Sequence, residues 1–191
     1  MNFASVKSLT IPEGKVKLIT RKSDGAVLWK GGYTNLLPLA TDADRKTIYG
    51  GDYNGDGKND GYKTNTRLSS SGGGPTIASG MCASGFVPAK VGDILRIKGT
   101  TPKTGTNSYI MTFDSSNKMV KACSMLQSGG RWTTQAESTL TPDWQEYDIA
   151  TDVLTVTLSS DYFGTGWDAV RFSAGVISAD TIVTINEEIT T

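Results

Sequence analysis

The side chains best suited to chemistry lie in residues 51–61, which read Gly-Asp-Tyr-Asn-Gly-Asp-Gly-Lys-Asn-Asp-Gly. Oxygen-bearing side chains alternate along this stretch, and Gly57 follows the third of them. Ca²⁺ takes six to eight oxygen ligands at roughly 2.3–2.6 Å, and a glycine permits the sharp turn that wraps the ion. The spacing therefore predicts a structural calcium loop over residues 52–60. The predicted ligands are Asp52, Asn54, Asp56, the backbone carbonyl of Lys58, and Asp60.

The loop resembles two families of calcium-binding loop, the dockerin or EF-hand type and the Asp-x-Asn-Gly-Asp-Gly-x-x-Asp loop of integrin-type FG-GAP repeats. An EF-hand loop ends in Glu at its twelfth place, which here is Lys63, and neither flank has a helical period. The FG-GAP type therefore fits better. The alternative is a turn that binds no ion, because Gly, Asn and Asp are also the residues that turns prefer.

A second kind of site is indicated by an aromatic residue in a polar loop, Trp132 within residues 129–135. Sugar-binding sandwiches use exposed aromatic rings as flat platforms, rimmed by polar side chains that bond to hydroxyl groups. The alternative for Trp132 is a ring tucked over the edge of the core. Trp144 and Trp167 begin strand-like runs and are expected to pack inward. The predicted ligand-binding residues are Trp132, Arg131, Gln135 and Tyr109.

This sequence offers few of the residue types that enzymes use for catalysis, because it contains no histidine. This excludes Ser-His-Asp and Cys-His triads, zinc sites with His ligands, and the commonest general base. Glycoside hydrolysis requires two facing carboxylates, and Asp143, Glu146, Asp161 and Asp168 are candidates whose convergence the sequence does not establish. We expect a protein that is not an enzyme.

The composition limits the size of the core and the kinds of partner and compartment expected for this protein. The 191 residues suffice for one well-formed core, and 19 Lys and Arg balance 19 Asp and Glu. This balance gives no reason to expect a nucleic-acid or membrane partner. No signal-type or membrane-spanning apolar run is present, so the chain is expected to be made in the cytoplasm. Cys82 and Cys123 are too few for a disulfide scaffold; one bridge and two free thiols both remain open.

The elements that must position these residues are short strands. Alternating runs separated by turn signals predict an all-β fold, an antiparallel β-sandwich of jelly-roll type over residues 33–191. The run from Thr66 is expected to begin as a strand and dissolve into a flexible loop over residues 69–75. Residues 1–32 read as a small three-strand meander, which either packs on the sandwich or attaches to another chain. The predicted strands of the sandwich include residues 93–98, 108–113, 118–124, 153–158, 167–172 and 181–185.

Several stretches resemble a family of phage and prophage virion-associated proteins; they are residues 33–36, 67–72, 85–97 and 181–189, together with an opening, residues 3–29, that looks like an attachment segment. The resemblance implies a jelly-roll domain similar to carbohydrate-binding modules, displayed on a virion as a tail, fibre or capsid-decoration component. It further implies partners among other virion proteins, a homo-oligomer, and a glycan as ligand. The alternatives are a stand-alone carbohydrate-binding module or adhesin and, last, a glycan-active enzyme.

Overall fold

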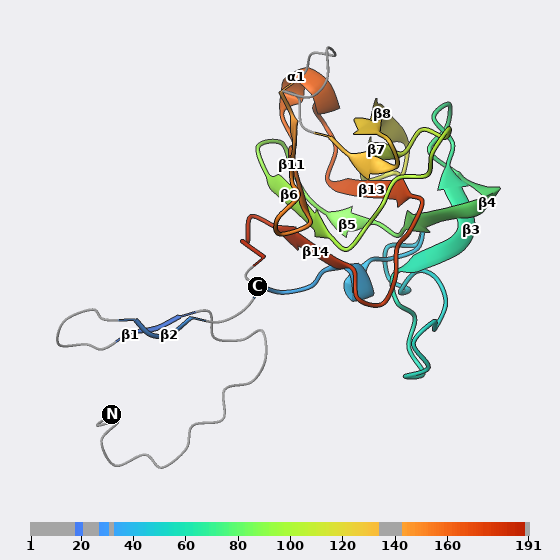
Figure 1. The fold of residues 1–191 in the computed structure, drawn as a ribbon. Helices are drawn as coiled ribbons and strands as arrows, with labels where there is room; N and C mark the ends of the chain where they lie inside the picture. The colour runs from blue at the N-terminus through green and yellow to red at the C-terminus, as the bar shows by residue number, and fades with distance from the viewer. Residues whose placement is uncertain (1–17, 21–26, 31–32, 134–142, 190–191) are drawn as a thin grey trace.

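Strands make up nearly all of the regular structure of the computed structural model, which describes residues 18–20, 27–30, 33–133 and 143–189 (Figure 1). The strands are β1 (Leu18–Thr20), β2 (Val27–Lys30), β3 (Tyr62–Leu68), β4 (Pro75–Ser84), β5 (Val87–Pro88), β6 (Ile94–Lys98), β7 (Tyr109–Phe113), β8 (Met119–Ser124), β9 (Gln127–Ser128), β10 (Arg131–Trp132), β11 (Gln145–Asp148), β12 (Val153–Thr157), β13 (Ala169–Ala174) and β14 (Ile182–Ile185). The described helices are a 3-10 turn, η2 (Leu37–Leu39), and a short helix, α1 (Ser160–Phe163).

Two antiparallel sheets form the body of the molecule. One has the strand order β11-β12-β6-β14, and the other has the order β3-β4-β13-β7-β8 with β5 also paired to β13. On β6 the side chains alternate, so that Leu95 and Ile97 are buried, and Ile97 stands opposite Leu154 and Val183 on the neighbouring strands. This alternation is what a strand with one face on a core requires.

The main hydrophobic core lies between the two sheets. It joins Ile97 and Val156 of the first sheet to Ile110, Val170 and Phe172 of the second. The prediction of an all-β antiparallel sandwich is confirmed, while the narrower jelly-roll topology stays a prediction.

The second sheet is also covered on its outer face. All six residues of β13 are buried, and a smaller cluster that includes Leu68, Phe86, Met111 and Phe113 lies apart from the main core. The turn between β3 and β4 packs on this cluster: a Cβ at Gly73, where φ is +71°, would lie 2.6 Å from the Phe113 ring. Only glycine allows so close an approach with that backbone conformation. The end of the β3–β4 hairpin is thereby held against β7.

Residues 41–49 also border the outer face, and two arginines mark their contact with it. The buried Arg171 guanidinium lies 4.8 Å from the ring centroids of both Tyr49 and Phe86, and its Nε donates to the Ser84 carbonyl at 3.0 Å. Arg45 lies over the Phe86 ring at 4.9 Å and pairs with Asp168 at 2.7 Å. Burial lowers the pKa of Arg171, and the aromatic faces offset part of the cost of burying its charge.

The strand predictions for residues 93–98, 108–113, 118–124, 153–158 and 181–185 agree with β6, β7, β8, β12 and β14. The strands that were not predicted include β4, which begins at Pro75 directly after the turn over residues 69–74, and the two-residue strands β9 and β10. In the predicted meander β1 pairs with β2, with Ile19 opposite Trp29. The first strand of the predicted three-strand meander lies outside the described residues.

The sequence left the pairing of the cysteines open and predicted no membrane span. Cys82 and Cys123 are both free thiols. Among the described residues, no helix is long and apolar enough to cross a membrane.

Candidate functional site

The acidic loop folds around the carboxylate of Asp52. This carboxylate accepts from the backbone N–H groups of Gly55, Asp56 and Gly57 at 2.7, 3.2 and 2.8 Å. The side-chain oxygen of Asn54 accepts from Asp56 N at 2.9 Å, which adds a second local turn. The sequence folds this way because its short oxygen-bearing side chains reach amides a few residues ahead.

The far end of the loop is anchored in the sandwich. Asp60 is buried and accepts from Tyr53 N at 2.8 Å and from Asn54 Nδ2 at 3.0 Å. A Cβ at Gly61, with φ of +79°, would lie 1.6 Å from the Leu37 carbonyl oxygen, so this position requires glycine. The rim of the loop is open by comparison, since a Cβ at Gly57 would meet nothing within 4 Å.

The donor set of the loop suits a hard cation, but its carboxylates are not drawn together. All predicted ligands offer oxygen, as Ca²⁺ prefers. Within the described ranges, however, no three His, Cys, Asp or Glu side chains form a group that could hold a metal ion. The described flanks are not the two helices of an EF-hand, because the 3-10 turn η2 precedes the loop and β3 follows it at Tyr62.

Trp132 is not an exposed platform, and this prediction is wrong. The side chain is 1% exposed and belongs to the main core, where its Nε1 donates to the Thr100 carbonyl at 2.9 Å. The physical reason is that β10, paired with β9, turns the indole inward, where it buries a large apolar surface and still satisfies its one donor. The tucked alternative is therefore correct. Trp144 and Trp167 are buried as expected.

Of the remaining predicted ligand residues, the structure describes Arg131 and Tyr109, which lie on different strands. Arg131 is exposed on β10, beside the buried Trp132, and its charge lowers the pKa of Tyr147 against the larger raising effect of burial. Gln135 lies outside the described residues. Tyr109, at the start of β7, is half-buried and packs against the outer cluster of the second sheet.

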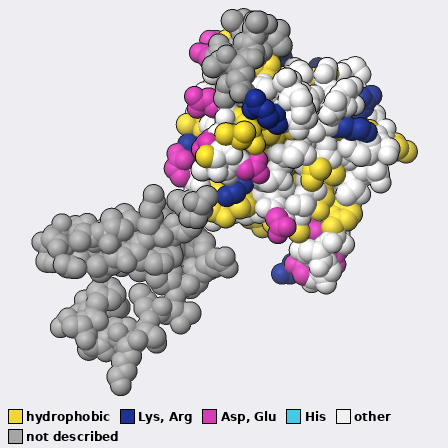
Figure 2. Space-filling view, in the orientation of Figure 1, with side chains coloured by type: hydrophobic (Ala, Val, Ile, Leu, Met, Phe, Trp, Pro, Cys, Tyr) yellow, Lys and Arg dark blue, Asp and Glu magenta, His cyan; other side chains and the backbone are white. Residues whose placement is uncertain are grey.

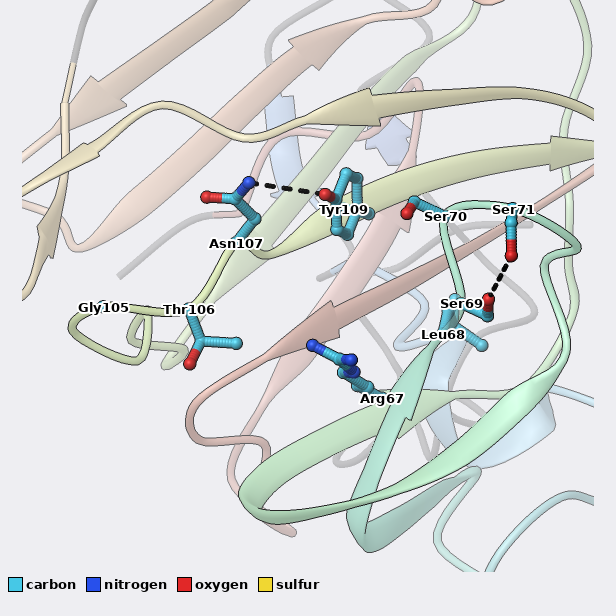
Figure 3. Close-up of a pocket in the computed structure, with 9 residues that line it drawn as sticks. All are labelled: Arg67, Leu68, Ser69, Ser70, Ser71, Gly105, Thr106, Asn107 and Tyr109. Atoms are coloured by element: carbon cyan, nitrogen blue, oxygen red, sulfur yellow. Dashed lines mark hydrogen bonds between the residues drawn. The ribbon is translucent and has the colours of Figure 1, made fainter.

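Tyr109 lines an open polar cleft of about 440 Å³ between the end of β3 and the segment that enters β7 (Figure 3). Figure 3 shows the Tyr109 ring beside Asn107, with Arg67 reaching toward Thr106 below them. Asn107 Nδ2 donates to the Tyr109 hydroxyl at 3.4 Å. The cleft is lined by Arg67, Leu68, Ser69, Ser70, Ser71, Gly105, Thr106, Asn107 and Tyr109.

A second hollow of about 370 Å³ adjoins this cleft and shares Gly105, Thr106 and Asn107 with it. Its other side is formed by Thr104 and by residues 127–130. Gln127 Nε2 donates to the Thr106 carbonyl at 2.7 Å and so joins the two sides. The 129–135 loop singled out in the sequence therefore borders the site through its glycines rather than through Trp132.

Arg67, the serines at 69–71, Thr106 and Asn107 were not predicted as ligand residues. The available signal was two polar runs, residues 67–72 and 104–108, each next to a strand end. Neither run shows by itself that the other is its neighbour. The contact depends on the Gly73 turn, which bends the β3–β4 hairpin over Phe113.

The candidate catalytic carboxylates lie on different elements. Asp168 is paired with Arg45 before β13, Glu146 is exposed on β11 of the other sheet, and Asp161 is in the first turn of α1. Asp143 precedes β11 and is exposed. None of these four residues lines the Tyr109 cleft.

Comparison with protein families, with curated proteins and with solved structures finds no match to this chain.

Proposed function

We propose that this chain is a non-enzymatic glycan-binding β-sandwich, displayed on a phage virion as a tail, fibre or capsid-decoration component. The observation that carries the binding part is the Tyr109 cleft. It combines an aromatic ring with hydroxyl, amide and guanidinium groups, which is the chemistry that a sugar requires: a flat apolar face and several hydrogen-bonding partners. Its volume falls within the range of small-molecule sites.

The virion part of the proposal is supported by the sequence resemblance and by residues 1–32. A short ladder such as β1–β2 is too small to be stable alone and gains stability by pairing with another surface. In this proposal it joins the sandwich to other virion proteins or to further copies. A stand-alone adhesin would use the same cleft but would not need that segment.

A calcium ion held by the loop at residues 52–60 belongs to the same proposal as a structural staple. Asp52, Asn54, Asp56 and Asp60 would supply side-chain oxygens and Lys58 its carbonyl. The ion would offset the repulsion among three carboxylates that stand within nine residues.

The test is titration of the full chain against a panel of bacterial-surface and mucosal oligosaccharides. Tyr109→Ala is expected to abolish saturable binding because it removes the ring, whereas Tyr109→Phe keeps the ring and retains most of the affinity. Circular dichroism and thermal unfolding of each variant serve as the folding control. Binding that survives Tyr109→Ala unchanged would contradict the assignment of this cleft.

A further inference from the structure

The charge in and around the Tyr109 cleft is of one sign. Arg67 is the charged residue among those that line it, and no Asp or Glu lines either the cleft or the adjoining hollow. The segments that form the two hollows, residues 67–71, 104–109 and 127–130, contain Arg67 and no other charged residue. The whole chain, by contrast, has equal numbers of basic and acidic residues.

Both signs of charge occur on the molecular surface shown in Figure 2, where acidic and basic side chains are scattered over the face shown. The ion pairs of Arg45 with Asp168 and of Arg96 with Glu188 involve no residue that lines either hollow. A field of one sign confined to a concave surface attracts ligands of the opposite charge.

The Arg67 guanidinium is placed to meet such a ligand. Its side chain extends from the end of β3 into the cleft (Figure 3), and no ion pair or side-chain hydrogen bond engages it in the described part of the chain. A guanidinium offers five N–H donors in a planar fork that matches a carboxylate or sulfate. Lys103 lines neither hollow and donates to the Ser79 carbonyl, so the fork of Arg67 supplies the directional contact in the cleft.

We infer that the cleft selects acidic sugars, whose carboxylate or sulfate group pairs with Arg67 while a face of the sugar lies on the Tyr109 ring. This inference rests on the proposed glycan-binding function and names its ligand class. Asn107, Thr106 and the serines at 69–71 would then bond to the hydroxyl groups of the same sugar.

The experiment compares acidic oligosaccharides with their neutral parents by calorimetric titration of the full chain. The probes are a uronic-acid oligomer, a sialylated trisaccharide and a sulfated galactan, each with its uncharged counterpart. The expected result is tighter binding of at least one acidic probe, about tenfold or more, which is the effect of a hydrogen bond to a charged group. Whether the carboxylate or the sulfate probes bind identifies the anion.

Three variants separate the contributions. Arg67→Gln is expected to remove the preference for the acidic probe, and Arg67→Lys, which keeps the charge but not the fork, is expected to retain part of it. Lys98→Gln, a matched loss of one positive charge on β6 of the other sheet, is expected to leave binding unchanged. Binding of the acidic probe should also weaken as salt is raised, since salt screens exposed charges.

The possible failures are distinguishable. Equal binding of acidic and neutral probes, unaffected by Arg67→Gln but lost with Tyr109→Ala, would overturn the acidic preference and leave the glycan-binding function standing. No binding of any probe by a folded chain would overturn both.

Discussion

At Trp132 two demands on an indole are met together, burial of its rings and a partner for its N–H. Replacing Trp132 with Ala removes the rings from the main core and is expected to cost about 3–5 kcal/mol of unfolding free energy. Trp132→Phe keeps most of the apolar volume but leaves the buried Thr100 carbonyl without its donor, so about 1–3 kcal/mol is expected. Urea unfolding followed by circular dichroism measures both. A Trp132→Ala variant of normal stability that had lost glycan binding would contradict the buried role of this ring and support its use as a sugar platform.

Two other groups shielded from water, the half-buried Cys123 and the buried Tyr62, make the stability depend on alkaline pH. Burial raises the pKa of the Cys123 thiol from 9 to about 11, and burial, with the charge of Asp60, raises that of the Tyr62 hydroxyl from 10 to about 12. In each case the unfolded chain loses its proton first. The stabilisation is therefore complete below pH 9 and is lost as the pH rises toward 11 and 12.

The measurement for this pH prediction is the unfolding free energy in urea from pH 7 to 12, with Cys123→Ala as the comparison. The variant lacks the thiol and is expected to show a smaller decline between pH 9 and 11. An identical decline in both proteins would assign the effect to other groups.

At the scale of elements, the calcium loop offers a prediction that uses the native chain. An ion that binds the folded loop alone raises the unfolding free energy, by about 2.7 kcal/mol at a concentration 100 times its dissociation constant. The melting temperature is therefore expected to be higher in millimolar Ca²⁺ than in chelator. Asp52→Ala should abolish the difference, because this carboxylate organises three backbone amides of the loop. A melting temperature that does not respond to Ca²⁺ would support the alternative that the loop is a turn that binds no ion.

Elements were predictable where one face of a strand meets a core. On β6 buried and half-buried positions alternate, and on β12 the two threonines take the half-buried and the exposed position while the apolar residues are buried. β4 gave no such signal because the exposed residues at its start are small and uncharged, and because Ile77 is 96% exposed where an apolar residue suggests burial. The direction of Trp132 was also not readable, since β10 has two residues and the pairing with β9 decides which side chain points inward.

The candidate site could not be predicted for a related reason. Its sides come from residues 67–71 and 105–109, and the contact between them follows from the turn at Gly73 against Phe113. Tyr109 was predicted from its type and place at the start of a strand. Its partner Arg67 could be found only when the bend of the hairpin was known.

At the scale of the whole molecule, the second sheet both closes the main core and carries the candidate site. Its inner face closes the main core with the four-stranded sheet, and its outer face carries the smaller cluster and, at one end, the Tyr109 cleft. Because the strand that carries Tyr109 also contributes Ile110 to the main core, the ring is held on a rigid element. A ligand site on a rigid element loses little conformational freedom when its ligand binds.

The last prediction concerns residues 1–32, and it follows from the strand pairing. β1 and β2 pair with each other and with no other described strand, so both sheets of the sandwich are complete without them. A chain that begins at residue 33 is therefore expected to unfold at nearly the same urea concentration as the full chain and to retain the Tyr109 cleft. If residues 1–32 attach the sandwich to a virion or to further copies, as proposed, the shortened chain is expected to lose self-association or attachment, measured by light scattering after size-exclusion chromatography and by co-sedimentation with particles. A shortened chain that unfolds much earlier would show that the segment packs on its own sandwich, and one that still assembles normally would remove its role in attachment.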